Sequence, residues 1–397
     1  MNYDTSREQT AAELRRQLAT ELEAGGSLTS DAWRAAVEAV PRHSFVPRFY
    51  REIDAPGLTT WKPYAADLVG EYEWLCAAYA DESLITQFDG HEIDWTDPAP
   101  VRGATPTSSS TMPSLVVRML ELLDAEDGHR VLEIGTGTGY STALLCHRLG
   151  AAQVTSIEYD QDVAARARKA FTNAGNRPRL VVGDGLMGDP VGAPYERIVA
   201  TCGVRRIPHA WVEQTGPSGV ILATVRGWMR SVGLVRLDVA DDGTADGSFI
   251  DGATSFMIAR QQEAPPSLGM VPTADDGETR IATHGPEVLT DPDTGILVQL
   301  TAPDARHVTM SLDGGPLSTY VLDAADESFA VLAPRTGGGW TVRQGGPVRL
   351  WDAIESTLDR WDAVGRPSAD QLRIRVTPSK QTIWHPADPT SLTWSAE

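Results

Sequence analysis

The ten residues RVLEIGTGTG, from Arg130 to Gly139, constrain the fold of this chain more than any other stretch. A short apolar run leads into an acid and then into Gly135, Gly137 and Gly139, and the helix-forming segment YSTALLCHRLG follows at once. This order predicts a strand, a glycine turn and a helix, the layout in which a chain brings its backbone against a nucleotide-like ligand. Glycine suits such a turn because it tolerates positive φ and has no β-carbon to block a close approach.

The loop spacing is GxGxG, whereas a dinucleotide-binding loop reads GxGxxG and usually faces a pyrophosphate. Glu133 stands two residues before the first glycine. A carboxylate there would repel a pyrophosphate but would suit a cationic cofactor. S-adenosylmethionine carries a sulfonium and an ammonium group, so the sign of its charge fits this position.

Short apolar runs alternate with helical segments after the loop. The sequence predicts strands at residues 130–134, 153–158, 179–182, 196–202 and 219–225, with helices at 139–149 and 160–174. This alternation is typical of an α/β protein with a parallel, doubly wound, Rossmann-like sheet. Ligands bind such a sheet at the carboxyl ends of its strands.

Two acids fall at those predicted strand ends. Glu158 ends the second strand, where a carboxylate can accept from both ribose hydroxyls of an adenosine. Asp184 lies in the turn after the third strand, where it could accept from the adenine amino group. Either residue alone could be a helix cap or a solvated acid. Together with the loop they predict a nucleoside-type cofactor.

Four consecutive hydroxyl side chains precede Pro113, which suits the first turn of a helix reaching Leu123. They are Ser108, Ser109, Ser110 and Thr111. Such a run is often only a cap or a linker. Beside a helix N-terminus it could also bind a carboxylate, because hydroxyls and unpaired backbone N–H groups donate to anions.

Upstream, leucines at every fourth position predict a helix over residues 6–24, and Ser30 can cap a second helix that reaches Val40. The motif VPRHSFVP then indicates a helix end and a rigid loop. Residues 51–106 have weak periodicity and many aromatic side chains. We expect this segment to wrap one side of the cofactor domain.

The C-terminal part differs in composition. QEAPPSLGMVPTADDGET indicates a linker, after which ILVQLT, HVTMSL, TYVLD and FAVLAP resemble short strands. A helix is predicted over residues 348–364, with a strand pair LRIRV and QTIWH after it. The predicted division is 1–105 (helical and wrapping segment), 106–262 (cofactor domain), 263–275 (linker) and 276–397 (separate α+β domain). The tryptophans of the C-terminal α+β domain would form a core or a peptide-binding surface.

Composition limits the partners. The 397 residues carry 54 acidic and 34 basic side chains, a net charge of −20, which argues against nucleic acid or an anionic membrane and is otherwise explained by solubility. Three scattered cysteines indicate a reducing compartment, and no histidine spacing predicts a metal. The start, MNYDTSREQT, is polar and shows no signal peptide. These features predict a cytoplasmic protein, and we expect a monomer.

Six motifs, in this order along residues 30–226, together resemble protein-L-isoaspartate O-methyltransferase: VPRHSFVP, residues 106–123, VLEIGTGTGY, VTSIE, GDG and APYERIVAT. The resemblance implies transfer of a methyl group from S-adenosylmethionine to a peptide carboxylate, leaving S-adenosyl-L-homocysteine. The ordinary repair enzyme is a compact single domain. SSST in place of the family's stretch before the proline, RIPHAW, and the tryptophan-rich tail helix resemble the enzymes that accompany ATP-grasp peptide ligases. Those methylate an aspartate of an ester-cross-linked ribosomal peptide (a graspetide), and the ester closes to an aspartimide.

The resemblance also assigns residues. The methionine side of the cofactor would lie at Glu133, Gly135, Thr136, Gly137 and Gly139, the ribose at Glu158, and the adenine at Asp184 and Gly185. The predicted cofactor site further includes Ser109, Thr138 and Tyr159. Thr111 stands where the family has its active-site serine, and whether Thr111 or Ser110 does that work is open. Hydroxyls of the run 108–111 would orient the acceptor carboxylate.

Four functions are compared. The first is methylation of a cross-linked ribosomal peptide, which a separate C-terminal domain favours, and the second is general repair of isoaspartyl proteins. The third is a catalytically silent peptide-binding scaffold, which the intact loop and its two acids disfavour. The fourth is nucleic-acid methylation, which the charge disfavours.

Overall fold

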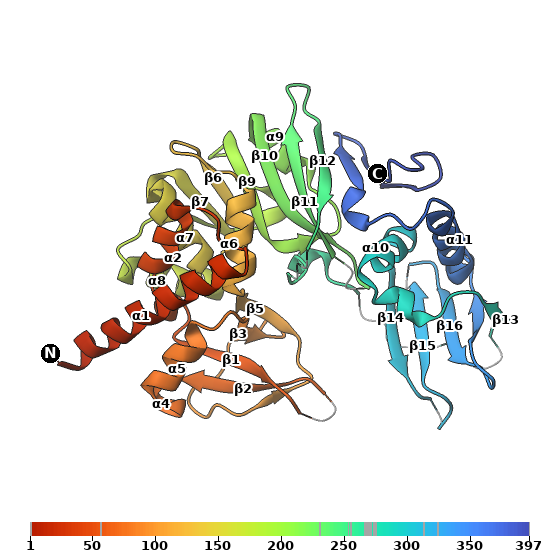
Figure 1. Cartoon of the computed structure of the whole chain (residues 1–397), viewed down its shortest axis with the longest axis horizontal. Coiled ribbons are helices and arrows are strands. Elements are labelled where there is room, and N and C mark those ends of the chain that lie inside the picture. Colours follow the sequence, from red (N-terminus) through yellow and green to blue (C-terminus); the bar gives the residue numbers. More distant parts are fainter. Residues whose placement is uncertain are drawn as a thin grey trace. The chain divides into compact units, whose positions relative to one another are not determined.

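The computed structural model describes residues 2–55, 58–229, 232–252, 254, 256–265, 272, 276–312, 314–323 and 325–396. The chain divides into two compact units (Figure 1). The first comprises residues 1–202 and 210–222, and the second comprises residues 203–209 and 223–397. In the described part of the chain, no helix is both long and apolar enough to cross a membrane.

A parallel sheet lies at the centre of the first unit. Its strands follow the spatial order β9 (Tyr195–Val204), β6 (Val131–Ile134), β7 (Val154–Glu158) and β8 (Arg179–Val182). The crossover helices are α7 (Tyr140–Leu149) and α8 (Gln161–Asn173), and both pack against β7. β10 (Thr215–Arg226) follows α9 (His209–Gln214). The doubly wound α/β architecture is therefore confirmed, because the alternating runs fold as strand and crossover helix.

The other helices of this unit are mostly N-terminal to the parallel sheet. They are α1 (Asn2–Ala24), α2 (Asp31–Ala39), α3 (Arg42–Phe45), α4 (Ala66–Val69), α5 (Glu71–Ala78) and α6 (Pro113–Leu122). Two short 3-10 turns are η1 (Ala151–Gln153) and η2 (Gly185–Met187). Ser30 caps α2 by accepting from the backbone N–H of Trp33, as expected. VPRHSFVP differs from the expected loop, because it contains the short helix α3 with Arg42 and His43 buried.

The segment expected to wrap the cofactor domain contributes most of an antiparallel sheet, together with α4 and α5. Its order is β4 (Val101–Arg102), β2 (Thr60–Ala65), β1 (Arg48–Ile53), β3 (Leu84–Phe88) and β5 (Pro106–Ser110). Aromatic contacts stabilise it: the ring of Phe88 lies 5.4 Å from Tyr50 and 5.1 Å from Trp61. Some of the aromatic side chains that obscured the strand periodicity, Trp61 and Phe88 among them, thus lie in the core of this sheet.

The second unit contains two antiparallel sets of strands. One has the order β11 (Val232–Val239), β12 (Ala245–Ile250), β18 (Arg373–Val376), β19 (Gln381–Trp384) and β20 (Thr393–Ala396). The other has the order β13 (Glu278–Ala282), β17 (Trp340–Gly345), β16 (Ser328–Pro334), β15 (Ser318–Asp323) and β14 (Ala305–Met310). Its helices and turns are η3 (Arg260–Gln262), η4 (Pro286–Leu289), α10 (Pro292–Thr301), α11 (Leu350–Ala363) and η5 (Ala369–Gln371).

This division differs from the expected boundary at residue 262. Apart from residues 203–209, the compact second unit starts at residue 223, and the pairing of β12 with β18 joins residues 245–248 to residues 373–376. A cofactor domain spanning 106–262 therefore does not match the packing. Most of the expected linker 263–275 lies outside the described residues.

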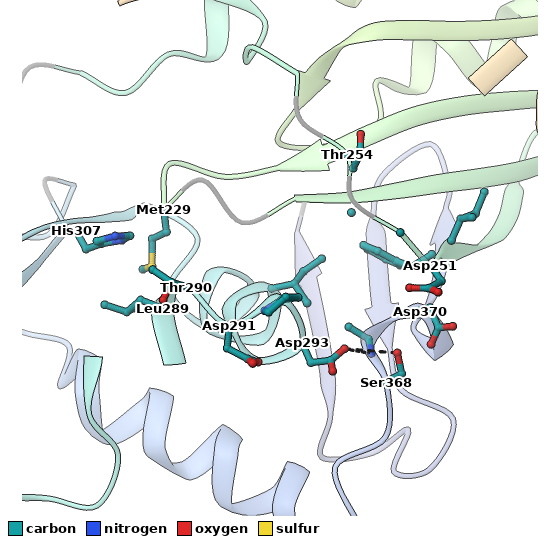
Figure 2. A pocket seen from close by; sticks show the side chains of 17 residues that line it. Met229, Asp251, Thr254, Leu289, Thr290, Asp291, Asp293, His307, Ser368 and Asp370 are labelled. Carbon is teal, nitrogen blue, oxygen red and sulfur yellow. Dashed lines mark hydrogen bonds between the residues drawn. The ribbon is translucent and has the colours of Figure 1, made fainter. Parts of the chain in front are cut away.

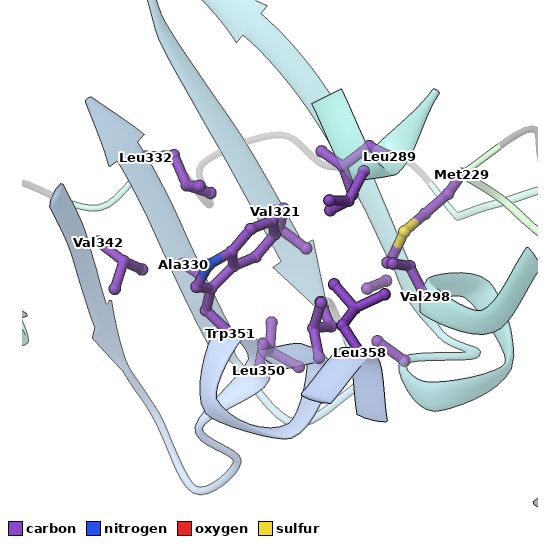
Figure 3. Packing of buried hydrophobic residues seen from close by; sticks show 14 residues of the cluster. Met229, Leu289, Val298, Val321, Ala330, Leu332, Val342, Leu350, Trp351 and Leu358 are labelled. Carbon is purple, nitrogen blue, oxygen red and sulfur yellow. The ribbon is translucent and has the colours of Figure 1, made fainter. Parts of the chain in front are cut away.

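The predicted face of α11 is confirmed: Leu350, Ile354, Leu358 and Trp361 are each at most 2% exposed. Three of them join a core with Trp351 against β15–β17 (Figure 3). The expectation of a strand at ILVQLT is wrong, since these residues lie in α10. Asp291 caps that helix by accepting from the N–H of Thr294. The residues ILVQLT are mostly apolar because this part of α10 is buried on most sides. A short apolar run of this kind does not distinguish a strand from a helix.

Candidate active site

The loop between β6 and α7 turns at three glycines in the left-handed region. φ is +96° at Gly135, +54° at Gly137 and +90° at Gly139. A β-carbon at Gly135 would lie 2.9 Å from Oγ1 of Thr201, and one at Gly137 would lie 3.2 Å from the carbonyl oxygen of Ser109. The predicted need for positive φ is borne out by this geometry. The closest obstacle at each of these two positions is the protein's own chain.

Glu158 lies at the carboxyl end of β7, and backbone groups fix the direction of its half-buried side chain. Its Oε2 accepts from the N–H of Gly137 at 2.9 Å, and its Oε1 accepts from the N–H of Asp160 at 3.0 Å. The acid and the central glycine of the loop are therefore in direct contact. The sequence placed Glu158 at the end of this strand but did not predict the contact.

Asp184 lies at the next strand end and begins η2, where its carboxylate accepts from the N–H of Leu186 at 2.9 Å. The following turn is held from α9: the indole N–H of Trp211 donates to the carbonyl oxygen of Gly185 at 2.8 Å. Trp211 is completely buried. Trp211, the last residue of RIPHAW, thus fixes the turn that the resemblance assigns to adenine.

Cys202, near the end of β9, is close enough to Glu158 and Asp184 for their charges to affect its thiol. Burial, together with the charges of Glu158 and Asp184, raises the pKa of the Cys202 thiol to about 12. Three strand ends therefore bring their polar groups together. The set offers carboxylate acceptors for hydroxyl and amino donors and would repel a phosphate, so it fits an adenosyl group. In the described part of the chain, no three His, Cys, Asp or Glu side chains form a group that could hold a metal.

Glu133 corrects one expectation. Its side chain is fully buried below the loop, so its carboxylate is not at the surface where a cofactor's cation would meet it. Hydroxyls of Ser141, Thr142 and Ser156 donate to it. Burial raises the pKa of Glu133, and the three hydroxyl donors oppose this rise. The residue joins β6, β7 and the start of α7, and it supports the loop from inside.

Thr136 also faces inward. It is 2% exposed, its hydroxyl lies 2.6 Å from the hydroxyl of Ser156, and its backbone N–H donates to the carbonyl oxygen of Ile157. It therefore shapes the loop from within. Thr138 is partly buried in the loop, and Tyr159 is half exposed after Glu158. These two remain on the accessible side of the site.

The hydroxyl run is a strand with two faces, and this corrects a second expectation. Ser108 and Ser110 are 7% and 2% exposed, whereas Ser109 and Thr111 are only partly buried. β5 pairs with β3, so its side chains alternate between the inside and the outside. Ser110 and Ser108 are therefore not available to a carboxylate, and the open choice between Ser110 and Thr111 favours Thr111.

Arg42 anchors the end of this strand. It is completely buried, and its guanidinium donates to the carbonyl oxygens of Ser110 and Thr111 at 3.1 Å each and to the hydroxyl of Ser110 at 3.3 Å. Further carbonyl acceptors are those of Ala78, Ala80 and Glu82. Burial lowers the pKa of Arg42 to about 10, which leaves it charged at neutral pH.

Besides Arg42, sequence reasoning missed three supporting residues. Thr201 donates to the carbonyl oxygen of Ile134 at 3.1 Å. Gln87 is 1% exposed, donates to Asp160 at 2.9 Å and accepts from Thr107. Trp211 is the third. Thr201 lies in APYERIVAT and Trp211 in RIPHAW, but no motif in the sequence includes Gln87, because its partners lie in other elements.

Comparison with known proteins assigns this arrangement to a family. Residues 84–253 match the family model for protein-L-isoaspartate(D-aspartate) O-methyltransferase. The chain is 32% identical over 227 residues to protein-L-isoaspartate O-methyltransferase 2 of Archaeoglobus fulgidus, a match that covers 57% of this chain and 80% of the relative. The corresponding protein of Thermococcus sibiricus is 30% identical, with 56% and 83% covered. The match to that of Azorhizobium caulinodans, 40% identical over 139 residues, covers 35% of this chain and 63% of the relative.

A solved protein-L-isoaspartate O-methyltransferase structure has a similar fold, with a TM-score of 0.52 and 21% identity. The likeness covers 96% of this chain and 99% of the solved one. It therefore extends into both units, so the second unit is not peculiar to this chain. The family model and the sequence relatives identify the chain as an S-adenosylmethionine-dependent carboxyl methyltransferase. The chain belongs to the protein-L-isoaspartate O-methyltransferase family.

Proposed function

We propose that this chain methylates the free α-carboxylate of an isoaspartyl residue in a polypeptide, with Thr111 beside the acceptor. One observation supports the proposal most. The end of β5 lies against the cofactor loop, since a β-carbon at Gly137 would be 3.2 Å from the carbonyl oxygen of Ser109. Thr111 follows directly and is accessible.

The chain's own residues would hold S-adenosylmethionine at the carboxyl ends of β6, β7 and β8. The glycine loop would receive the methionine part, Glu158 would accept from the ribose hydroxyls, and Asp184 would accept from the adenine. When bound there, S-adenosylmethionine supplies a methyl group on a positively charged sulfur. Ser109, Thr138 and Tyr159 would border the same space.

The acceptor needs orientation more than activation. A carboxyl group with an ordinary pKa near 4 is already ionised at pH 7, so no general base is required. The hydroxyl of Thr111 would donate to one carboxylate oxygen and direct the other toward the methyl group. Fixing two reactants in this way can lower the barrier by about 7–11 kcal/mol. Arg42 would keep Thr111 in place through its carbonyl oxygen.

An ester-cross-linked ribosomal peptide is the second candidate substrate. SSST before Pro113, with threonine where the resemblance places a serine, favours an altered acceptor pocket. In that case an aspartyl methyl ester would lose methanol as the following backbone nitrogen closes the aspartimide ring. The presence of the second unit no longer favours this candidate, because the solved family structure is matched over nearly its whole length as well.

A mass-spectrometric assay separates the two substrates. The full chain is incubated with S-adenosylmethionine and one of three peptides: an isoaspartyl peptide, its normal aspartyl counterpart, or an ester-cross-linked precursor peptide. Methylation of the isoaspartyl peptide alone supports the first proposal. Methylation of the cross-linked peptide alone, followed by loss of methanol, supports the second and overturns the first.

A matched pair of variants checks that the signal comes from this site. Glu158→Ala should abolish methyl transfer to either peptide, because it removes the acceptor for the ribose hydroxyls. Glu126→Ala, at an exposed position before β6, should transfer at the wild-type rate. Equal rates in both variants would contradict the assignment of the site.

A further inference from the structure

The second unit contains a cavity of about 750 Å³, and none of its lining residues belongs to the site assigned above (Figure 2). This volume is within the range of roughly 300–1,000 Å³ that is usual for ligand pockets. Residues from β11, β12, α10, β14 and the η5 turn contribute to its wall. The cavity is larger than one side chain needs, so a short peptide segment could enter it.

Part of the wall is apolar. Phe249, Leu289 and Ile296 are each at most 5% exposed, and Met229 at 2% lies with them. Such a surface would cover a hydrocarbon chain and exclude water from it.

The polar part of the wall is acidic. Its four carboxylates belong to Asp251, Asp291, Asp293 and Asp370. Among the described residues that line the cavity there is no lysine or arginine, and His307 is the one further side chain that can carry a charge. A ligand that enters therefore meets negative potential, which favours a cation over an anion.

Two of these carboxylates accept hydrogen bonds that stabilise the second unit. Asp291 caps α10 by accepting from Thr294. Asp293 accepts from the N–H of Ala369 at 2.8 Å and from the hydroxyl of Ser368, which holds η5 against the start of α10. In Figure 2 the carboxylates of Asp293, Asp251 and Asp370 lie toward the same side of the cavity.

Asp370 differs from these two residues. Its Oδ1 is buried and has no hydrogen-bond partner in the described structure. A buried acceptor without a donor is costly, by about 1–3 kcal/mol, so its position is explained if a ligand supplies the donor. This observation is independent of the count of acids around it.

The arrangement of the carboxylates disfavours a bare metal ion. In the described residues no three of them, with or without histidine, come together as a metal group. Carboxylates spread along a partly apolar wall instead match a long side chain with a charged end. Lysine and arginine bury their methylene groups on apolar surface and keep their charged ends with polar partners.

We infer that this cavity binds a basic residue of the polypeptide substrate, with its stem on the apolar wall and its charged end at Asp251 and Asp370. The inference rests on the proposed function, because it takes a polypeptide as the substrate. It adds a second point of recognition, formed by residues other than those assigned to the methylated carboxylate, that would select substrates with a lysine or arginine.

The test moves one arginine along a set of otherwise neutral isoaspartyl peptides. Each arginine peptide is paired with a citrulline peptide, which keeps the shape and loses the charge. For the wild-type chain, the arginine peptide at the best position should have a KM at least about tenfold below that of its citrulline pair. Asp251→Asn/Asp370→Asn should remove this difference and leave kcat unchanged. Asp241→Asn, an exposed acid elsewhere in the unit, should keep it.

A binding assay keeps this result separate from catalysis. Fluorescence anisotropy of labelled arginine and citrulline peptides, with asparagine in place of isoaspartate, reports affinity whether or not methylation occurs. Weaker binding of the arginine peptide to the double variant supports the inference even if neither peptide is methylated. Equal affinity of the two peptides at every position, or a preference that persists in the double variant, overturns it. Displacement of the arginine peptide by micromolar Ca²⁺ would also overturn it, since the cavity would then be a cation site.

Discussion

The guanidinium of Arg42 and the carbonyl oxygen of Thr111 lie 3.1 Å apart in the interior of the first unit, although the two residues are 69 positions apart in the chain. The same guanidinium holds Ser110 and three carbonyl oxygens between Ala78 and Glu82. VPRHSFVP therefore acts on the acceptor side of the site without belonging to its surface. Arg42 is a positioning residue for the segment that carries Thr111.

Replacing Arg42 should disturb this segment. Arg42→Met leaves several buried carbonyl oxygens without donors, and we expect a loss of about 3 kcal/mol or more in the free energy of unfolding. Arg42→Lys restores some donors but not the planar fork, and should transfer methyl groups slowly while binding S-adenosyl-L-homocysteine normally. Urea denaturation and calorimetric titration measure both effects. Arg16→Met, on the exposed face of α1, is the control. Wild-type kcat in Arg42→Lys would remove Arg42 from this role.

The two neighbouring hydroxyls should behave differently. Thr111→Ala removes an accessible hydroxyl and should lower kcat by about tenfold or more without weakening cofactor binding. Thr111→Ser should retain most of the activity, because the donor remains. Ser110→Ala should affect mainly stability, by about 1 kcal/mol, since this hydroxyl meets Arg42 inside the protein. Steady-state kinetics on an isoaspartyl peptide decide the matter, and a larger kcat loss in Ser110→Ala would reverse the assignment.

Gly137→Val should abolish cofactor binding while the first unit stays folded. A residue with φ of +54° is strained when it is β-branched, and the new side chain would press on the Ser109 carbonyl oxygen. Calorimetric titration with S-adenosyl-L-homocysteine should show no heat of binding. Gly216→Ala is the matched control, because its β-carbon would meet only ordinary contacts at 3.8 Å. Wild-type affinity in Gly137→Val would contradict the proposed position of the cofactor.

Glu133→Gln tests the inner support of the loop. The carboxamide has the same shape but only one oxygen, so at least one of the three hydroxyls loses its acceptor. We expect a loss of about 1–3 kcal/mol in stability and weaker cofactor binding. Glu126→Gln at the surface serves as the comparison. If Glu133→Gln bound the cofactor with unchanged affinity and melted at the wild-type temperature, the network would be unimportant.

His43 predicts a pH dependence of stability. Burial lowers the pKa of His43 from 6.5 to about 4. Near pH 5 its imidazole is therefore protonated in the unfolded chain and neutral in the folded chain. Stability from this source is complete above pH 6.5 and falls as the pH drops toward 4. Between pH 7 and pH 5 the wild type should lose about 2 kcal/mol more than His43→Phe, by denaturant titration. Parallel curves for the two proteins would show that His43 is not responsible.

The sequence predicted the main elements of the site because each is specified by residues close together in the chain. The glycines of the loop, the alternation from β6 to β8 and the acid that ends β7 are all readable within short windows. The face of α11 followed from its helical period in the same way. These elements agree with the structure since each is determined by a nearby cap, turn or apolar stripe.

The rest depended on contacts between distant segments. Glu133 lies inside because hydroxyls from α7 and β7 satisfy it, and nothing in RVLEIGTGTG shows which way its side chain points. The run 108–111 gave no strand signal, because four polar residues do not alternate in hydropathy, although their burial does alternate. Arg42 and Gln87 were missed since their partners are main-chain or side-chain groups from other elements.

The most direct test measures methyl-ester formation on an isoaspartyl peptide by the full chain, with S-adenosylmethionine that carries an isotopically labelled methyl group. The account predicts one labelled methyl ester, sensitive to mild alkali, at a rate that Thr111→Ala reduces and Glu158→Ala abolishes. An unlabelled peptide after prolonged incubation with a folded, cofactor-binding chain, or an unchanged rate in both variants, would contradict it.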